Sequence, residues 1–132
     1  MRRIAAALVA GVLAAGCGGE SGDLMAIDVS GGKARGDEFE IVIASDGRGT
    51  CNDGPQETIA SDLVIDAREL ERDLGDLAEE GATFGGGGDD ARQYVVRIKD
   101  GTVRWVEGEP GLPEVLPRTQ LLALELDRLL CR

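Results

Sequence analysis

The stretch "YVVRIKDGTVRWV", residues 94–106, carries the clearest structural pattern in the chain. Apolar and polar side chains alternate on both sides of Asp100-Gly101, a dipeptide typical of a two-residue turn between antiparallel strands. Pairing across that turn sets Ile98 opposite Val103 and predicts a hairpin with one apolar face, because the turn and the hydrophobic pattern agree. The residues predicted to share that face are Tyr94, Val96, Ile98, Val103 and Trp105.

An earlier part of the chain repeats this arrangement less tightly. Residues 24–29 and 39–44 both alternate between apolar and polar side chains. Between them, "SGGKARGD" (residues 30–37) has the glycine and aspartate content of a turn. These segments predict a first hairpin with a long connection.

Two apolar stripes with helical spacing follow the two hairpins. The predicted stripes are Leu63, Ala67, Leu70, Leu74 and Leu77 in the first helix, and Leu122, Leu126, Leu129 and Leu130 in the second. Asp66 and Glu69 resemble a capping box, so the first helix is expected to start there, after a short strand at residues 63–65. Gly81 is a natural stop for it. Residues 81–90 are expected to be the most flexible segment, and residues 107–117 a proline-stiffened loop.

The resulting order is strand, strand, helix, strand, strand, helix. No long crossover separates the strands that pair, so the sequence predicts an α+β fold. We expect a single four-stranded antiparallel sheet with both helices on its apolar face (ββαββα).

The first 17 residues indicate export. Arg2 and Arg3 precede an uncharged run at residues 4–16, which is too short for a permanent membrane span but typical of a signal peptide. The run ends in "LAAGC" (residues 13–17), which resembles the lipobox of bacterial lipoproteins. That resemblance implies that Cys17 is diacylated and becomes the mature N-terminus. An ordinary secretory signal cleaved nearby is the alternative.

This interpretation divides the chain into three parts. Residues 1–16 form the predicted signal peptide, residues 17–23 a flexible tether, and residues 24–132 one small domain. We expect the domain on the outer face of the cytoplasmic membrane, attached to the membrane by its lipid.

The two remaining cysteines, Cys51 and Cys131, allow only one pairing once Cys17 carries lipid. An oxidising compartment permits that bridge. It would close most of the predicted domain and contribute about 4 kcal/mol on the chain-entropy model. Two separate buried thiols are the alternative.

Composition argues against several classes of function. The chain has 25 acidic and 14 basic residues and a formal net charge of −11, so charge attracts it neither to nucleic acid nor to an anionic membrane. It contains no histidine, which excludes Ser-His-Asp triads and HExxH zinc sites. The "GGGG" at residues 85–88 lacks the Lys-Ser/Thr of a phosphate loop, and "DGRGTCNDG" (residues 46–54) does not match calcium-loop spacing. We therefore expect a noncatalytic protein without nucleotide, metal or other cofactor.

From residue 25 to residue 130 the layout resembles the emfourin class of small bacterial proteins. The resemblance is carried by "IDVSGG" (27–32), "ARELERDLGDLAEEG" (67–81), "YVVRIKDGTVRWVEGE" (94–109) and "LPEVLPRTQLLALELDRLL" (112–130). It implies a proteinaceous, noncatalytic inhibitor of thermolysin-type metalloproteases that occupies the protease cleft with loops and its N-terminal segment. Ser30, Gly31 and Gly32 are then a candidate contact with an extracytoplasmic protein partner; a plain hairpin turn is the alternative. A structural or accessory envelope lipoprotein without inhibitory activity is the second functional hypothesis.

Overall fold

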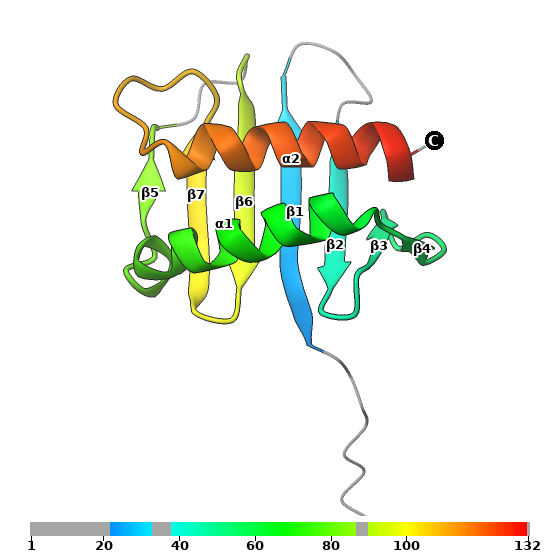
Figure 1. Ribbon diagram of the computed structural model, residues 1–132. Coiled ribbons are helices and arrows are strands. Elements are labelled where there is room, and N and C mark those ends of the chain that lie inside the picture. Colours follow the sequence, from blue (N-terminus) through cyan, green and yellow to red (C-terminus); the bar gives the residue numbers. More distant parts are fainter. Residues whose placement is uncertain (1–21, 33–37, 87–89, 132) are drawn as a thin grey trace, which may run out of the picture.

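The computed structural model describes residues 22–32, 38–86 and 90–131, which form one mixed sheet with two helices packed on one face (Figure 1). The strands are β1 (Asp23–Gly31), β2 (Phe39–Ala44), β3 (Arg48–Cys51), β4 (Glu57–Thr58), β5 (Thr83–Phe84), β6 (Arg92–Ile98) and β7 (Gly101–Val106). The helices are α1 (Ser61–Glu79) and α2 (Val115–Leu130). The predicted signal peptide and Cys17 lie outside the described residues.

The sheet is larger than predicted and is not purely antiparallel. Its seven strands lie in the order β4-β3-β2-β1-β6-β7-β5, and β5 runs parallel to β7. The prediction of a four-stranded antiparallel sheet is therefore wrong, although the four expected strands form its centre. Strands β3, β4 and β5 are four, two and two residues long, too short for a period-two pattern. They are strands because they bond to the edges of a sheet that is already built.

The hairpin of β6 and β7 has a different register from the predicted one. Ile98 pairs with Gly101 and Val96 with Val103, so Lys99 and Asp100 occupy the turn. The pairing is shifted by two residues, which leaves every side chain on its predicted face. The predicted apolar residues are all buried.

Helix α1 begins earlier than expected. It starts at Ser61, so residues 63–65 are helical and not a strand, and no side chain caps its first turn at Ala60. Leu63 and Val64 are buried in that first turn. Burial of these two side chains, rather than the capping pattern at Asp66, therefore determines where the helix starts. Gly81 follows the end of the helix with a φ of +61°, as its predicted role as a stop requires.

Helix α2 also begins before the predicted loop ends. Its first turn contains Pro117, which is tolerated there because backbone N–H groups in the first turn have no intrahelical acceptor. The buried side of the helix includes Leu116 and Thr119, whereas Leu129, placed on the apolar stripe by its spacing, is 51% exposed.

The core lies between the sheet and the two helices, which cross the strands on the same side (Figure 1). Met25, Ile27 and Val29 of the central strand β1 are fully buried against this layer. Ala26 on the opposite side of β1 is also buried, since β2 and β6 flank it with Val42 and Arg97. Because both helices lie on one side of the sheet, no helix covers its other face within the described residues.

Candidate functional site

The Cys51–Cys131 disulfide is present and joins the end of the last helix to β3. Cys51 ends β3 and Cys131 caps the C-terminus of α2, with their Cα atoms 5.3 Å apart and 80 residues between them in sequence. The predicted pairing is confirmed, and neither sulfur is available as a nucleophile while the bridge is intact.

The chain around Cys51 is shaped to present its sulfur to α2. Asn52 and Asp53 adopt positive φ angles of 50° and 57°, which turn the backbone sharply after β3. Asn52 accepts a hydrogen bond from the Glu40 amide through its side chain, and its own amide donates to the Glu40 carbonyl, both at 2.9 Å. These two hydrogen bonds fix the turn to β2.

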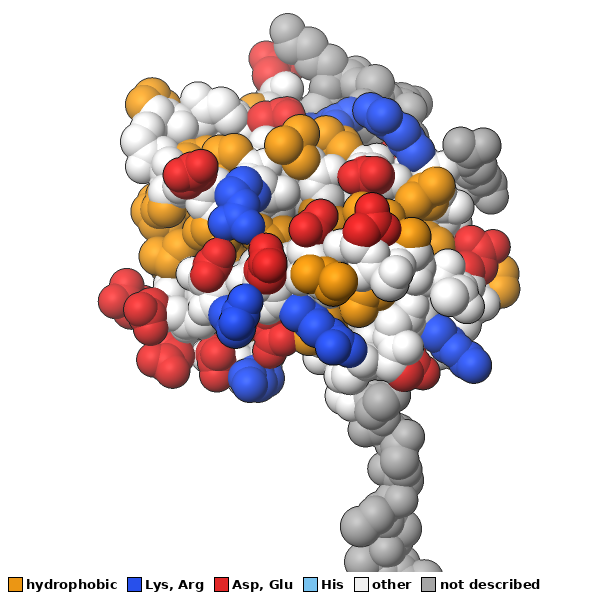
Figure 2. All heavy atoms as spheres, in the orientation of Figure 1, with side chains coloured by type: hydrophobic (Ala, Val, Ile, Leu, Met, Phe, Trp, Pro, Cys, Tyr) orange, Lys and Arg blue, Asp and Glu red, His pale blue; other side chains and the backbone are white. Residues whose placement is uncertain are grey.

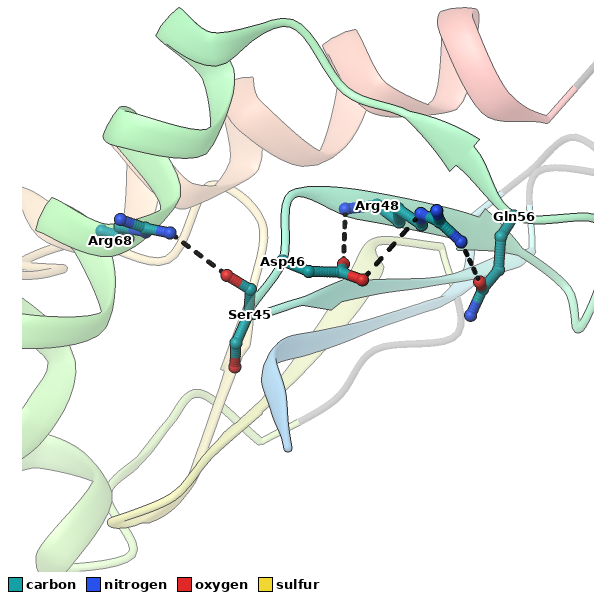
Figure 3. Close-up of polar contacts among 5 residues, drawn as sticks. All are labelled: Ser45, Asp46, Arg48, Gln56 and Arg68. Atoms are coloured by element: carbon teal, nitrogen blue, oxygen red, sulfur yellow. Dashed lines mark hydrogen bonds and ion pairs between the residues drawn. The ribbon is translucent and has the colours of Figure 1, made fainter. Parts of the chain in front are cut away.

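A polar cluster holds the β2–β3 turn to the neighbouring elements (Figure 3). Arg68 of α1 donates to the Ser45 carbonyl at 3.1 Å. Arg48 pairs with Asp46 and donates to the Gln56 side chain ahead of β4 at 3.5 Å. Arg68 therefore anchors the helix to the turn.

The candidate contact residues Ser30, Gly31 and Gly32 lie at the end of β1. Ser30 pairs with Gln93 and Gly31 with Arg92 in the ladder between β1 and β6, so the first two belong to a strand and not to the predicted turn. Gly31 has a φ of +78°, and a Cβ there would lie 2.9 Å from the Ala91 carbonyl oxygen. All three residues are half-buried. The rest of the predicted loop, residues 33–37, lies outside the described residues.

The carboxylates of α1 are dispersed along the helix. Asp73 receives a hydrogen bond from Arg118 of α2 at 3.1 Å, and Glu71 lies 3.9 Å from Lys99 of the β6–β7 turn. These contacts tie α1 to its neighbours. No group of three or more His, Cys, Asp or Glu within the described ranges is arranged to hold a metal ion.

The larger surface hollow next to the sheet lies beside β5, β6 and β7 and has a volume of about 340 Å³. Gln93, Arg104 and Thr83 contribute polar side chains to its lining.

The helix layer carries an exposed apolar residue that the sequence analysis did not single out. Leu121 lies outside the predicted stripe of α2 and is 69% exposed. Its apolar side chain, at a helix position outside the predicted apolar stripe, is the sequence signal that could have identified it.

Comparison of the chain with protein-family models, curated proteins and solved structures finds no match. Neither helix of the described part is both long and apolar enough to span a membrane.

Proposed function

We propose that the protein is a lipid-anchored, extracytoplasmic, noncatalytic module that binds a protein partner, with a metalloprotease as the first partner to test. The observation that carries this proposal is the disulfide between Cys51 and Cys131. A bridge between β3 and the last helix forms and persists in an oxidising compartment, outside the cytoplasmic membrane in bacteria.

The N-terminal sequence supports the anchor. An arginine pair, a short uncharged run and a cysteine preceded by small residues are what lipid attachment at Cys17 requires. The strand β1 begins at Asp23, only six residues after that cysteine. The acyl chains would therefore hold the domain close to the membrane surface.

The noncatalytic part of the proposal rests on the available side chains. The chain has no histidine, and Cys51 and Cys131 are joined to each other. The domain therefore offers no imidazole as a general base and, while the bridge is intact, no thiol nucleophile; general acid-base catalysis would fall to other side chains, mainly exposed carboxylates.

Replacing Cys17 tests the anchor. Cys17→Ser removes the only atom that can form the thioether, so we expect the protein to leave the membrane fraction or to accumulate as an uncleaved precursor. Fractionation of cells followed by mass spectrometry measures both results. Mature Cys17→Ser protein that still sediments with membranes would contradict the lipid anchor.

A protease assay tests the partner. The purified protein with its bridge intact is expected to inhibit a thermolysin-type metalloprotease at micromolar concentration, and Gly31→Ala is expected to weaken inhibition because its Cβ collides with the Ala91 carbonyl. Gly86→Ala, where the Cβ meets no atom within 4 Å, is the matched control. Full protease activity at micromolar protein would reject the inhibitor and favour an accessory envelope lipoprotein.

A further inference from the structure

Two surface hollows adjoin α2, the first lined by leucines and charged residues and the second mainly by apolar side chains. The first, about 210 Å³, lies between α1 and α2, and the second, about 260 Å³, lies between α2 and the segment that joins β4 to α1. Their apolar lining includes Leu70, Leu121 and Leu122 in the first and Ile59, Leu126 and Leu129 in the second. We call these two hollows together the helix-layer groove.

The groove exposes large apolar side chains that the fold does not need for its core. Leu121 and Leu129 are 69% and 51% exposed, and the third such side chain in the described residues, Ile65 at 57%, also belongs to a helix. Figure 2 shows apolar side chains exposed between charged ones on this side of the molecule. Single exposed leucines are common, but leucines beside apolar hollows are typical of a binding surface.

The rim of the groove is acidic. Asp66 and Glu125 line the first hollow and Glu57 lines the second. The one cationic side chain in the lining, Arg118, is hydrogen-bonded to Asp73 at 3.1 Å. The lining thus holds three carboxylates and one arginine that already bonds to Asp73, so its net charge is negative, which complements a segment with cationic residues beside an apolar stripe.

Charge also argues against a second copy as the occupant. A second molecule would bring its own carboxylates to the interface, and the formal net charge of each chain is −11. Repulsion between two such surfaces opposes self-association.

We propose that the helix-layer groove binds a cationic amphipathic helix of a protein partner. Leu122 and Leu129 lie seven residues apart, about 10 Å along α2. Apolar side chains at positions i and i+7 of the incoming helix would therefore fill the two hollows, with Lys or Arg residues facing the carboxylates. This inference rests on the proposed function only for the premise that the domain binds a protein.

The probe is a labelled 18-residue peptide of leucine and lysine with its leucines on one helical face. We expect it to bind the full-length chain, with the bridge intact, in an anisotropy titration, and at least tenfold more tightly than a scrambled peptide of the same composition. Leu121→Ser combined with Leu129→Ser is expected to weaken binding at least tenfold. Val95→Ser, a half-buried apolar residue on the opposite face of the sheet, is the matched control and should leave binding unchanged.

Two double variants, each of which neutralises two carboxylates, distinguish binding in the groove from general attraction of the cationic peptide to an acidic protein. Asp66→Asn with Glu125→Gln is expected to weaken binding three- to tenfold, whereas Asp28→Asn with Glu38→Gln, which removes two exposed carboxylates elsewhere, should change it less than twofold. The substituted residues lie at the surface, and the fluorescence of Trp105 reports whether the core is retained.

Four results would overturn the proposal. They are absence of peptide binding at millimolar concentration, equal binding of the scrambled peptide, equal weakening by the two charge pairs, and self-association of the wild type that the leucine variants abolish. The last result would assign the groove to a second copy. The peptide titration needs neither membrane attachment nor protease inhibition, so a failure here and a failure of the proposed function are separately visible.

Discussion

At the residue scale, Tyr94 and Trp105 form an aromatic stack in the core. They pair across β6 and β7, and their rings stack with centroids 5.2 Å apart and planes within 6°. Both are almost completely buried, and the Trp105 Nε1 donates to the Gln120 side chain of α2 at 2.7 Å. The stack therefore joins the sheet to the second helix through the one polar atom of the indole.

Because Tyr94 is buried, the stability of the fold should decrease at alkaline pH. Desolvation raises the pKa of the Tyr94 hydroxyl, nearby Glu107 raises it further, and Arg92 opposes the rise. The folded chain then holds the phenolic proton more tightly than the unfolded chain, whose tyrosine pKa is about 10. This contribution to stability is complete below that pH and is lost as the pH rises through the folded-state pKa.

Tyr94→Phe tests this linkage. The phenyl ring keeps the stack but cannot ionise, so the unfolding free energy of the variant should fall less steeply above about pH 10 than that of the wild type. Urea unfolding at several pH values measures the difference. Tyr94 is the only tyrosine, so absorbance near 295 nm also follows its ionisation directly. Ionisation at the same pH in folded and urea-unfolded protein would contradict the expectation.

At the scale of elements, Gly101 determines how the second hairpin meets α1. Its φ is +144°, and a Cβ at this position would lie 2.1 Å from the carbonyl oxygen of Ala78, near the end of the helix. That space is occupied by helix backbone, which cannot move aside as a flexible side chain could. The close approach explains why this glycine begins β7 while Lys99 and Asp100 form the turn.

Gly101→Ala should accordingly be among the more destabilising substitutions. We expect a loss of roughly 3 kcal/mol or more in unfolding free energy, because the helix end or the hairpin must move. Gly86→Ala is the control, since its Cβ would meet no atom within 4 Å, and it should cost less than about 0.5 kcal/mol. Chemical denaturation compares the two. Similar stabilities would mean that the hairpin does not pack against Ala78.

At the scale of the whole molecule, the disulfide attaches the helix layer to the sheet. The bridge joins the end of α2 to β3 near one edge of the sheet, where Ile59 and Leu130 pack over Gly49. The two outermost strands, β4 and β5, have only two residues each. The sheet edges therefore offer little backbone for strand addition, and the proposed partner would bind through side chains instead.

Removing the bridge should lower the stability of the entire domain. Cys51→Ser with Cys131→Ser releases a constraint over 80 residues, which is worth about 4 kcal/mol on the chain-entropy model. The melting temperature should fall by about 10 °C or more. Calorimetry of the variant, with chemically reduced wild type as control, measures this. Equal melting temperatures with and without the bridge would show that strain cancels the entropic gain.

How far the sequence predicts this fold varies between its parts. The apolar faces of β1, β2, β6 and β7 followed from alternation, since a strand buried on one face must repeat every two residues. The pairing of Cys51 with Cys131 followed from the number of cysteines, since only these two remain once Cys17 is predicted to carry lipid. The start of α1 was missed because burial of Leu63 and Val64 outweighed a capping pattern five residues into the helix. On the functional side, the sequence context of Cys17 predicts lipid attachment, whereas no motif marks Leu121.

The sequence by itself determined the four central strands, the two helices, their common face and the bridge, because each depends on local periodicity or on a count of cysteines. Only the tertiary structure decided the three short strands, the hairpin register and the helix-layer groove. Strands β3 and β4 follow β2 as local hairpins that are too short to show alternation, and β5 forms by pairing with β7. The register of the second hairpin depends on the close approach of Gly101 to the helix backbone at Ala78, and the groove joins residues from three elements. Apart from β3 and β4, each of these features depends on contacts between segments that lie apart in the chain, which no local pattern encodes.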